Sequence, residues 1–376
     1  MLDTEHGMPR WTCTCPDWAE RGVVTHCKHI FSVEIVRSQV QPDGTTVTKT
    51  SRVTYTQDWT SYNAAQTNER DHFVTLLRDL CSGVTQPPRK PGPGRKPIPI
   101  ADVLTAATMK VYMGRSGRRT MPEYRALGAQ GLLDKIPSYN SVFRYVEDPG
   151  LTPILHGLVR RSATPLAGIE QDFAVDSTGI SLRTFAPGYR AEKYGDEQKP
   201  KQHGWIKFHA IIGVRTNVIT AVEVKHGSSA DSPEFVPLVK STKESGFKIR
   251  EVSADKAYSG HANLQAVIDI GATPFVPFRE GTGDGAGSPE SWRKLFHFFQ
   301  WHRQEFLEHY HKRSNVEATF SSIKRVIASS VRSKSPDAQI NEALLVALSH
   351  NIVRLVHAMY ELGIQPQFNL RMQGGE

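Results

Sequence analysis

The stretch Phe173-Ala-Val-Asp176-Ser-Thr-Gly179-Ile-Ser-Leu182 predicts the first strand of a sheet. It is rich in apolar and β-branched residues, which suit a pleated, half-buried surface. A carboxylate inside such a run is unusual and marks Asp176 as a candidate functional residue. Further strands are predicted at Phe208 to Val214, Val218 to Val224, Ile249 to Ala254 and Thr273 to Pro277, and the turn at Asn217 makes the first two a hairpin.

Helix signals lie between and after these strands. Ser232-Pro233-Glu234 has a cap, a proline and an acid in the order of a helix start, and Gly246 ends that helix. Ser259 is expected to cap a second helix that ends at Gly271. Longer helices are predicted from Trp292 to about Ser330 and from Gln339 to Leu362. The order of elements predicts an α/β fold, a mixed sheet with helical cover.

The region before this sheet is expected to be helical and basic, from Ile98 to about Val146. Residues 99–113 form an apolar-striped segment, and Thr120 with Glu123 suggests a capping box that opens a second helix. Ser138 is expected to cap a third, short helix. Three short basic helices are similar to a helix-turn-helix DNA-binding module. A helical subdomain that only packs on the rest is an equally open alternative.

A proline-rich segment separates this region from the N-terminal part. Ser82 to Pro97 contains five prolines, three glycines, four basic residues and no acid, so we expect a linker. Residues 61–80 before it predict a helix with one apolar stripe.

The composition is that of a basic globular protein. The chain has 376 residues, a net charge of +8 and a pI near 9.2, which favours a polyanionic partner. No apolar run reaches the length of about 18 residues that a membrane span needs, and the N-terminus does not resemble a signal peptide. We therefore expect no membrane partner and a cytoplasmic location.

Three of the four cysteines lie near the N-terminus and suggest a zinc site. Cys13 and Cys15 are two residues apart, and Cys27 and His29 repeat that spacing after an 11-residue loop. Three thiolates and one imidazole complete a closed tetrahedral shell, which is typical of structural Zn²⁺. Three buried thiols with an unrelated histidine are the alternative, and His26 is an alternative ligand. Cys81 is expected to be a free thiol.

The segment Tyr310-His-Lys-Arg313-Ser-Asn-Val-Glu317-Ala-Thr-Phe-Ser-Ser-Ile-Lys324 combines a phenol, two cations and a carboxylate at spacings of 3, 4 and 7. On a regular helix these residues share one face, within about 60°. A carboxylate binds a metal ion, while a guanidinium and an ammonium bind phosphate oxygens. Such a face suits a metal ion that holds a phosphate.

Two further carboxylates are candidates for the same site. Asp176 lies in the first strand, and Asp255 follows the fourth. Two-metal phosphodiester chemistry needs several carboxylates, and acids gathered together repel one another unless cations neutralise them. Each acid also has a structural interpretation when it is considered alone. Asp176 could form an Asx-turn, Asp255 could end a strand, and Glu317 could form a surface ion pair with Arg313. The three acids considered together favour a catalytic site.

At these residues the chain resembles a known family. Tyr310, Arg313, Glu317 and Lys324 match the Tyr-x2-Arg-x3-Glu-x6-Lys signature of DDE transposases from bacterial insertion sequences. Val-Asp176-Ser-Thr-Gly and Ala-Asp255-Lys-Ala-Tyr resemble the first and second acidic motifs of that family. The resemblance covers residues 165–360. Cys-x-Cys…Cys-x-His at the front resembles a SWIM zinc finger.

The resemblance implies a ribonuclease H-like fold, binding of terminal inverted repeats and cut-and-paste transposition. It implies that two Mg²⁺ or Mn²⁺ ions are held by Asp176, Asp255 and Glu317, and that Tyr310, Arg313 and Lys324 bind DNA phosphates. The implied partners are double-stranded DNA, as transposon ends and as target, and a second copy in a synaptic complex.

Two departures from these families stand out. Some relatives use a long β-rich insertion between the second Asp and the Glu to form a DNA hairpin intermediate, but here 61 residues intervene. Only 12 residues precede Cys13, fewer than we expect for the strand pair before a SWIM finger, so a truncated N-terminus is one interpretation.

The predicted organisation is a zinc finger at 1–35, a polar and helical segment with linker at 36–97, and a helical DNA-binding region at 98–165. A catalytic domain at 166–362 and a tail at 363–376 follow. The predicted function is a prokaryotic, nucleoid-associated DNA transposase with endonuclease activity. The alternatives are a zinc-finger DNA-binding or scaffolding protein with a decayed catalytic domain, and a non-transposing nuclease of similar fold.

Overall fold

The computed structural model describes residues 2–5, 8–11, 34–40, 46–52, 58–88, 96–182, 204–227, 229–283 and 287–368. The chain divides into two compact units, Met1–Trp59 and Thr60–Glu376.

The first unit contains two antiparallel strand pairs. β1 (Leu2–Glu5) pairs with β2 (Met8–Trp11), and β3 (Glu34–Val40) pairs with β4 (Thr46–Arg52). The expectation that too few residues precede Cys13 for a strand pair is wrong, because β1 and β2 pair within residues 2–11. The proposed zinc ligands Cys13, Cys15, Cys27 and His29 lie outside the described residues.

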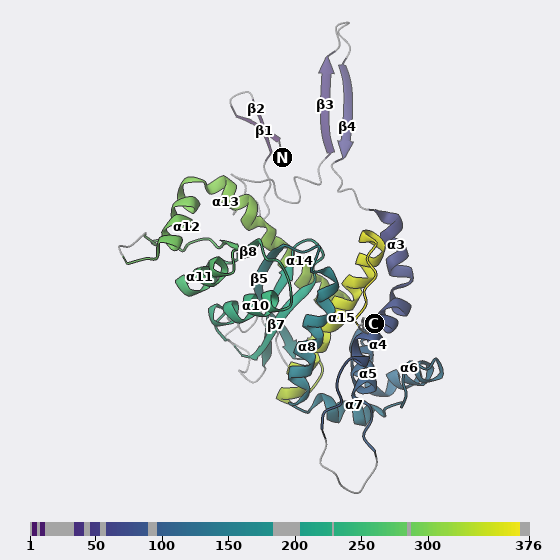
Figure 1. Cartoon of the computed structure of the whole chain (residues 1–376). Helices are drawn as coiled ribbons and strands as arrows, with labels where there is room; N and C mark the ends of the chain where they lie inside the picture. Colours follow the sequence, from purple (N-terminus) through teal and green to yellow (C-terminus); the bar gives the residue numbers. More distant parts are fainter. Residues whose placement is uncertain are drawn as a thin grey trace, which may run out of the picture. The chain divides into compact units, whose positions relative to one another are not determined.

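The second unit is built on a mixed sheet in the order β7-β6-β5-β8-β9 (Figure 1). β5 (Asp172–Leu182) pairs antiparallel with β6 (Trp205–Gly213), and β6 pairs antiparallel with β7 (Ile219–His226). On the other side of β5, β8 (Glu251–Ala254) and β9 (Thr273–Phe275) run parallel to it. The predicted hairpin between β6 and β7 is confirmed, and Asn217 in its turn has a φ of 61°.

Helices cover both faces of this sheet. Neighbouring residues of a strand point to opposite faces. Ser177 of β5 bonds to Asp231, at the start of α10 (Ser232–Glu244), whereas Thr178 bonds to Lys324 of the π-helical turn η4 (Ile323–Ile327). The elements from α13 (Arg303–Tyr310) through η3 (His311–Arg313), α14 (Ser314–Ser322) and η4 therefore lie opposite α10. The predicted α/β class, a mixed sheet with helical cover, is confirmed.

The remaining elements of the second unit's C-terminal half complete the cover. They are η2 (Lys256–Tyr258), α11 (His261–Asp269), α12 (Glu290–Trp301) and the short β10 (Ser330–Val331), which pairs parallel with the end of β5. The α11 helix begins after Gly260, one residue later than the predicted cap at Ser259.

The helical region precedes the sheet and belongs to the same compact unit. It consists of α3 (Trp59–Thr67), α4 (Glu69–Ser82), α5 (Ile100–Tyr112), α6 (Gly117–Ala129), α7 (Tyr139–Val146), α8 (Leu151–Ala163) and η1 (Thr164–Leu166). The predicted apolar stripe of α4 is confirmed, since Phe73, Leu76, Leu77 and Leu80 are buried.

Two predicted caps in this region have different outcomes. Ser138 caps α7 as predicted, since its hydroxyl accepts a bond from the Ser141 N–H at 3.1 Å. The capping box at Thr120 is wrong, because α6 begins at Gly117 and the Thr120 hydroxyl donates to the Ser116 carbonyl within the helix. Pro122 is tolerated inside α6, in its second turn.

The helix α15 (Pro336–Leu362) joins the helical region to the sheet. It packs on α4, α5, α8 and β7. Its fully buried Asn351 accepts a bond from the Ile219 N–H of β7 and donates to the Val159 carbonyl of α8. By length and composition α15 could cross a membrane, but 83% of its most apolar window is buried inside the protein. Such burial is typical of a helix in the core of a folded domain.

Candidate active site

The first two acids of the predicted triad lie at one place in the sheet. Asp176 is in the middle of β5, and the adjacent strand β8 ends level with it, because Val175 pairs with Ala254. Asp255 directly follows Ala254 and caps η2 by accepting a bond from the Lys256 N–H. Two parallel neighbouring strands thus bring both carboxylates to the point where β8 stops.

Arg313 links the third acid to the first. Its Nη1 donates to Asp176 Oδ2 at 2.7 Å, and its Nη2 donates to Glu317 Oε1 at 2.6 Å. The centre of the guanidinium lies 5.8 Å from the ring centroid of Tyr310. Three residues of the predicted signature thus meet next to Asp176.

The charges in this cluster influence one another. Burial raises the pKa of Asp176 to about 6, Arg313 opposes that rise, and the charges of Asp255 and Glu317 add to it. Burial alone would lower the pKa of Arg313, but Tyr310, Asp176 and Glu317 outweigh it and raise that pKa. Asp255 and Glu317 are therefore each close enough to Asp176 to disfavour its charge, and one guanidinium compensates Asp176 and Glu317.

The donor chemistry of the cluster fits a divalent cation, since carboxylate oxygens are the ligands that Mg²⁺ and Mn²⁺ prefer. The present arrangement does not bring the donors to one point. Across the described parts of the chain, no group of three or more His, Cys, Asp or Glu side chains is arranged to hold a metal ion. Instead, the guanidinium of Arg313 binds both Asp176 and Glu317.

The prediction of one regular helix from Tyr310 to Lys324 is wrong. Tyr310 ends α13, a 3₁₀ turn covers His311–Arg313, and a π turn covers Ile323–Ile327. Lys324 stands at the start of the π turn and reaches β5, where its Nζ donates to Thr178 Oγ1 at 2.6 Å.

The 3₁₀ turn that carries Arg313 is fixed to the sheet by its neighbour Lys312. Lys312 Nζ donates to Asp172 of β5 at 2.8 Å and to Glu251 of β8 at 2.7 Å. Asp172 also accepts two bonds from Arg250. These ion pairs position η3 over the junction of β5 and β8, where the Arg313 guanidinium can contact Asp176.

A second polar cluster lies on the other face of β5 and was not predicted. Ser177 Oγ donates to Asp231 Oδ1 at 2.6 Å, and Lys207 Nζ lies 2.7 Å from the same oxygen. His209 is fully buried beside them, and burial lowers its pKa to about 4, so it is neutral near pH 7. Asp231 precedes Ser232-Pro233, so from the sequence it resembles an ordinary helix cap.

Tyr258 lies within electrostatic range of both this second cluster and the acids. It is buried at the end of η2, and burial raises its pKa, as do the charges of Asp231, Asp176 and Asp255. Trp292 is a packed side chain that stacks on Phe296.

A match to a protein family agrees with this location. Residues 168–352 match a family model described as "Transposase DDE domain", and the matched range contains Asp176, Asp255, Glu317 and the whole signature from Tyr310 to Lys324. One solved structure, described as "Cryo-EM structure of piggyBac transposase synaptic complex with hairpin DNA (SNHP)", has 11% sequence identity and a TM-score of 0.37. The match covers 79% of this chain and 74% of that chain. The insertion-sequence branch and the SWIM finger stay predictions, and the family match over residues 168–352 supports a DDE transposase.

Proposed function

We propose that this protein is a DNA transposase that binds terminal inverted repeats and catalyses metal-dependent cleavage and strand transfer. The observation that carries the proposal is the contact of Arg313 with both Asp176 and Glu317, together with the position of Asp255 at the end of β8 beside β5, inside the region that matches the transposase DDE domain. A mixed sheet with helical cover is compatible with the ribonuclease H-like fold of the proposal.

Asp176 would contact both of two Mg²⁺ or Mn²⁺ ions, while Asp255 and Glu317 would each bind one. Bound divalent ions would supply an activated water and neutralise the leaving 3′ oxygen. The raised pKa of Asp176 supports this role, because a buried carboxylate crowded by two others gains from a nearby cation.

The protein's own cations would position the substrate. Arg313 binds two of the acids in this structure, and a guanidinium is equally suited to phosphate oxygens. We propose that it exchanges between these partners when DNA enters. Lys324 and Tyr310, on either side of the cluster, would hold further phosphates of the transposon end. Such residues would form no covalent bond with the DNA. They would contribute to catalysis by positioning the phosphates and by balancing their charge.

The remaining parts of the proposal concern partners and zinc. The partners would be inverted-repeat ends, target DNA and a second copy of the chain in a synaptic complex. The basic charge of the chain supports a DNA partner. Cys13, Cys15, Cys27 and His29 would hold one structural Zn²⁺.

The test compares two Asp→Asn variants. Asp176→Asn should reduce Mg²⁺-dependent cleavage of DNA that carries the element's own ends by at least about 10³-fold, because one ligand would serve both ions. Asp269→Asn removes an exposed carboxylate of α11 outside the acid cluster, so it should keep cleavage within about tenfold. Equal cleavage by Asp176→Asn and the parent protein in Mg²⁺ would reject the assignment.

The same assay separates the alternatives. A non-transposing nuclease would cut the ends but would not join the freed 3′-OH to target DNA. A DNA-binding or scaffolding protein with a decayed catalytic domain would bind the ends and leave them uncut in both Mg²⁺ and Mn²⁺.

A further inference from the structure

We propose that a basic groove between the helical region and the catalytic half holds the phosphate backbone of the DNA duplex beside the acid cluster. We define the basic groove by its six cations, Lys110, Arg115, Lys324, Arg325, Arg332 and Lys334. The choice of DNA as its ligand rests on the proposed function. The existence of the groove depends only on the residues that line it and on their charges.

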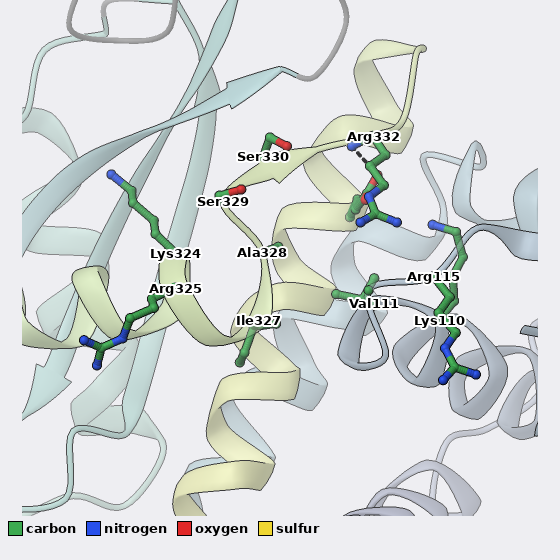
Figure 2. A pocket seen from close by; sticks show the side chains of 12 residues that line it. Lys110, Val111, Arg115, Lys324, Arg325, Ile327, Ala328, Ser329, Ser330 and Arg332 are labelled. Carbon is green, nitrogen blue, oxygen red and sulfur yellow. Dashed lines mark hydrogen bonds between the residues drawn. The ribbon is translucent and has the colours of Figure 1, made fainter. Parts of the chain in front are cut away.

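Two adjoining cavities form the groove, with volumes of about 170 and 440 Å³. Both are lined by Lys110, Val111, Arg115, Arg332 and Glu342, so they are continuous. Figure 2 shows Lys324 and Arg325 on one side, Lys110 and Arg115 on the other, and the segment from Ile327 to Ser330 between them. The walls thus come from α5, the turn after it, η4 and the segment that follows.

The charge of the groove is strongly positive. Against its six cations, the lining contains two carboxylates, Glu342 and Glu147. Glu342 is engaged with the backbone, since it accepts bonds from the N–H groups of Arg332 at 3.1 Å and Ser333 at 2.7 Å. Among the residues whose side chains are described, no carboxylate forms an ion pair with Arg115, Arg325 or Arg332. Like charges gathered in this way favour a polyanion as ligand.

The groove is continuous with the candidate active site. Lys324 lines it and donates to Thr178, two residues beyond Asp176 on β5. At the other end, the turn at Gly114, with a φ of 60°, lies close to the Arg332 guanidinium. A phosphate backbone that passes the acids can therefore continue along the cations toward α5.

The row of cations favours an extended ligand over a small anion. A single phosphate needs one or two cations, whereas this groove distributes its charges over η4, the segment after it and α5. The hydroxyls of Ser329 and Ser330 lie between the two basic sides and are neutral donors of the kind that phosphate contacts also use. The apolar side chains of Phe143, Val146 and Leu345 line the wider cavity next to α7 and α15.

The experiment measures how the affinity of the full-length protein for DNA depends on salt. The probe is a fluorescently labelled random-sequence duplex of about 30 base pairs, without added Mg²⁺ or Mn²⁺, because phosphate contacts are independent of sequence. The triple variant Arg115→Gln, Arg325→Gln and Arg332→Gln should weaken binding by at least about tenfold at low salt. It should also lower the slope of log K against log salt by about 3, near one per lost contact.

Two further variants serve as controls. Lys240→Gln, Lys243→Gln and Lys248→Gln together remove the same charge from α10 and the turn after it, outside both cavities, and should leave the slope nearly unchanged. The triple variant Arg115→Lys, Arg325→Lys and Arg332→Lys keeps the charge of the groove, so its slope of log K against log salt should match that of the parent protein. Because all three arginines are exposed, the melting temperature of the triple variant should match that of the parent protein.

Each outcome decides between the two proposals. If the groove and control variants lower the slope equally, the groove proposal is overturned, whatever Asp176→Asn does to cleavage. If the groove variant changes self-association of the protein but leaves the DNA slope intact, the groove binds an acidic segment of a second copy, which also overturns it. If the groove variant lowers the slope while Asp176→Asn still cleaves, the groove stands and the catalytic assignment fails.

Discussion

At the residue scale, the central feature is a guanidinium that serves two carboxylates. Arg313 contacts Asp176 and Glu317, and its side chain is only 15% exposed. The spacing of four residues made the pair with Glu317 foreseeable from the sequence. The pair with Asp176 was not, because it joins residues 137 positions apart and depends on the tertiary fold.

Removal of Arg313 should show how much the repulsion among the acids lowers the stability of the folded state. Without it, the largely buried Asp176 and the exposed Glu317 lose their shared counter-charge, so Arg313→Gln should lower the free energy of unfolding by about 2 kcal/mol without added divalent ions. Mg²⁺ should reduce this loss if the acids bind it. Denaturant unfolding with and without Mg²⁺ measures both effects.

Arg293→Gln is the matched control, because Arg293 is exposed on α12 and lies outside the acid cluster. It should change stability by less than about 0.5 kcal/mol in either buffer. A loss at Arg313 that Mg²⁺ leaves unchanged would argue against ion binding at these acids.

At the element scale, α15 connects the helical region with the sheet through buried polar side chains. His350 is 3% exposed, and its Nε2 lies 2.8 Å from the carbonyl oxygen of Asn217 in the β6–β7 turn. Burial lowers the pKa of His350 to about 4. A neutral imidazole is therefore part of the folded state.

This histidine predicts a loss of stability in acid. The unfolded chain takes up a proton near pH 6.5, while the folded chain does so only near pH 4, so the stability that His350 contributes declines as pH falls through that window. His350→Gln keeps an N–H donor and does not titrate. From about pH 7 to about pH 4.5, the parent protein should lose about 2 kcal/mol more than the variant.

The measurement is denaturant unfolding of both proteins across that pH range. Parallel pH profiles for the two proteins would show that His350 is protonated in the folded state, contrary to the expectation. His302→Gln serves as a control, because His302 is exposed and should leave the profile unchanged.

At the scale of the whole molecule, the two compact units predict a separable zinc site. The proposed ligands all lie within the unit Met1–Trp59. The full chain should contain about one Zn²⁺ per molecule, and a chain of residues 60–376 should contain none. The shortened chain should keep the melting temperature of the second unit.

Metal analysis of purified protein measures the zinc content. Cys13→Ser should abolish it, while Cys81→Ser, at a buried thiol of the second unit, should not. Zinc retained by residues 60–376, or absent from the full chain, would contradict the assignment.

Much of the element order was predictable because its signals are local. The strand that carries Asp176, the hairpin at Asn217 and the cap at Ser138 depend on short patterns of propensity and turn chemistry. The start of α6 was misplaced, because Thr120 and Glu123 fit a capping box equally well from inside the helix. A local pattern does not reveal which of two compatible starts packs better.

The sequence by itself determined which residues are proposed to carry the chemistry, since residue type and spacing single out Asp176, Asp255, Glu317 and the signature from Tyr310 to Lys324. Only the tertiary structure decided which of them meet. It placed Asp255 beside Asp176 through the parallel pairing of β8 with β5, and it brought Lys324 to Thr178 of β5. It also brought Arg115 near Arg332. Such contacts join residues far apart in the chain, and their energies depend on packing that no local pattern encodes.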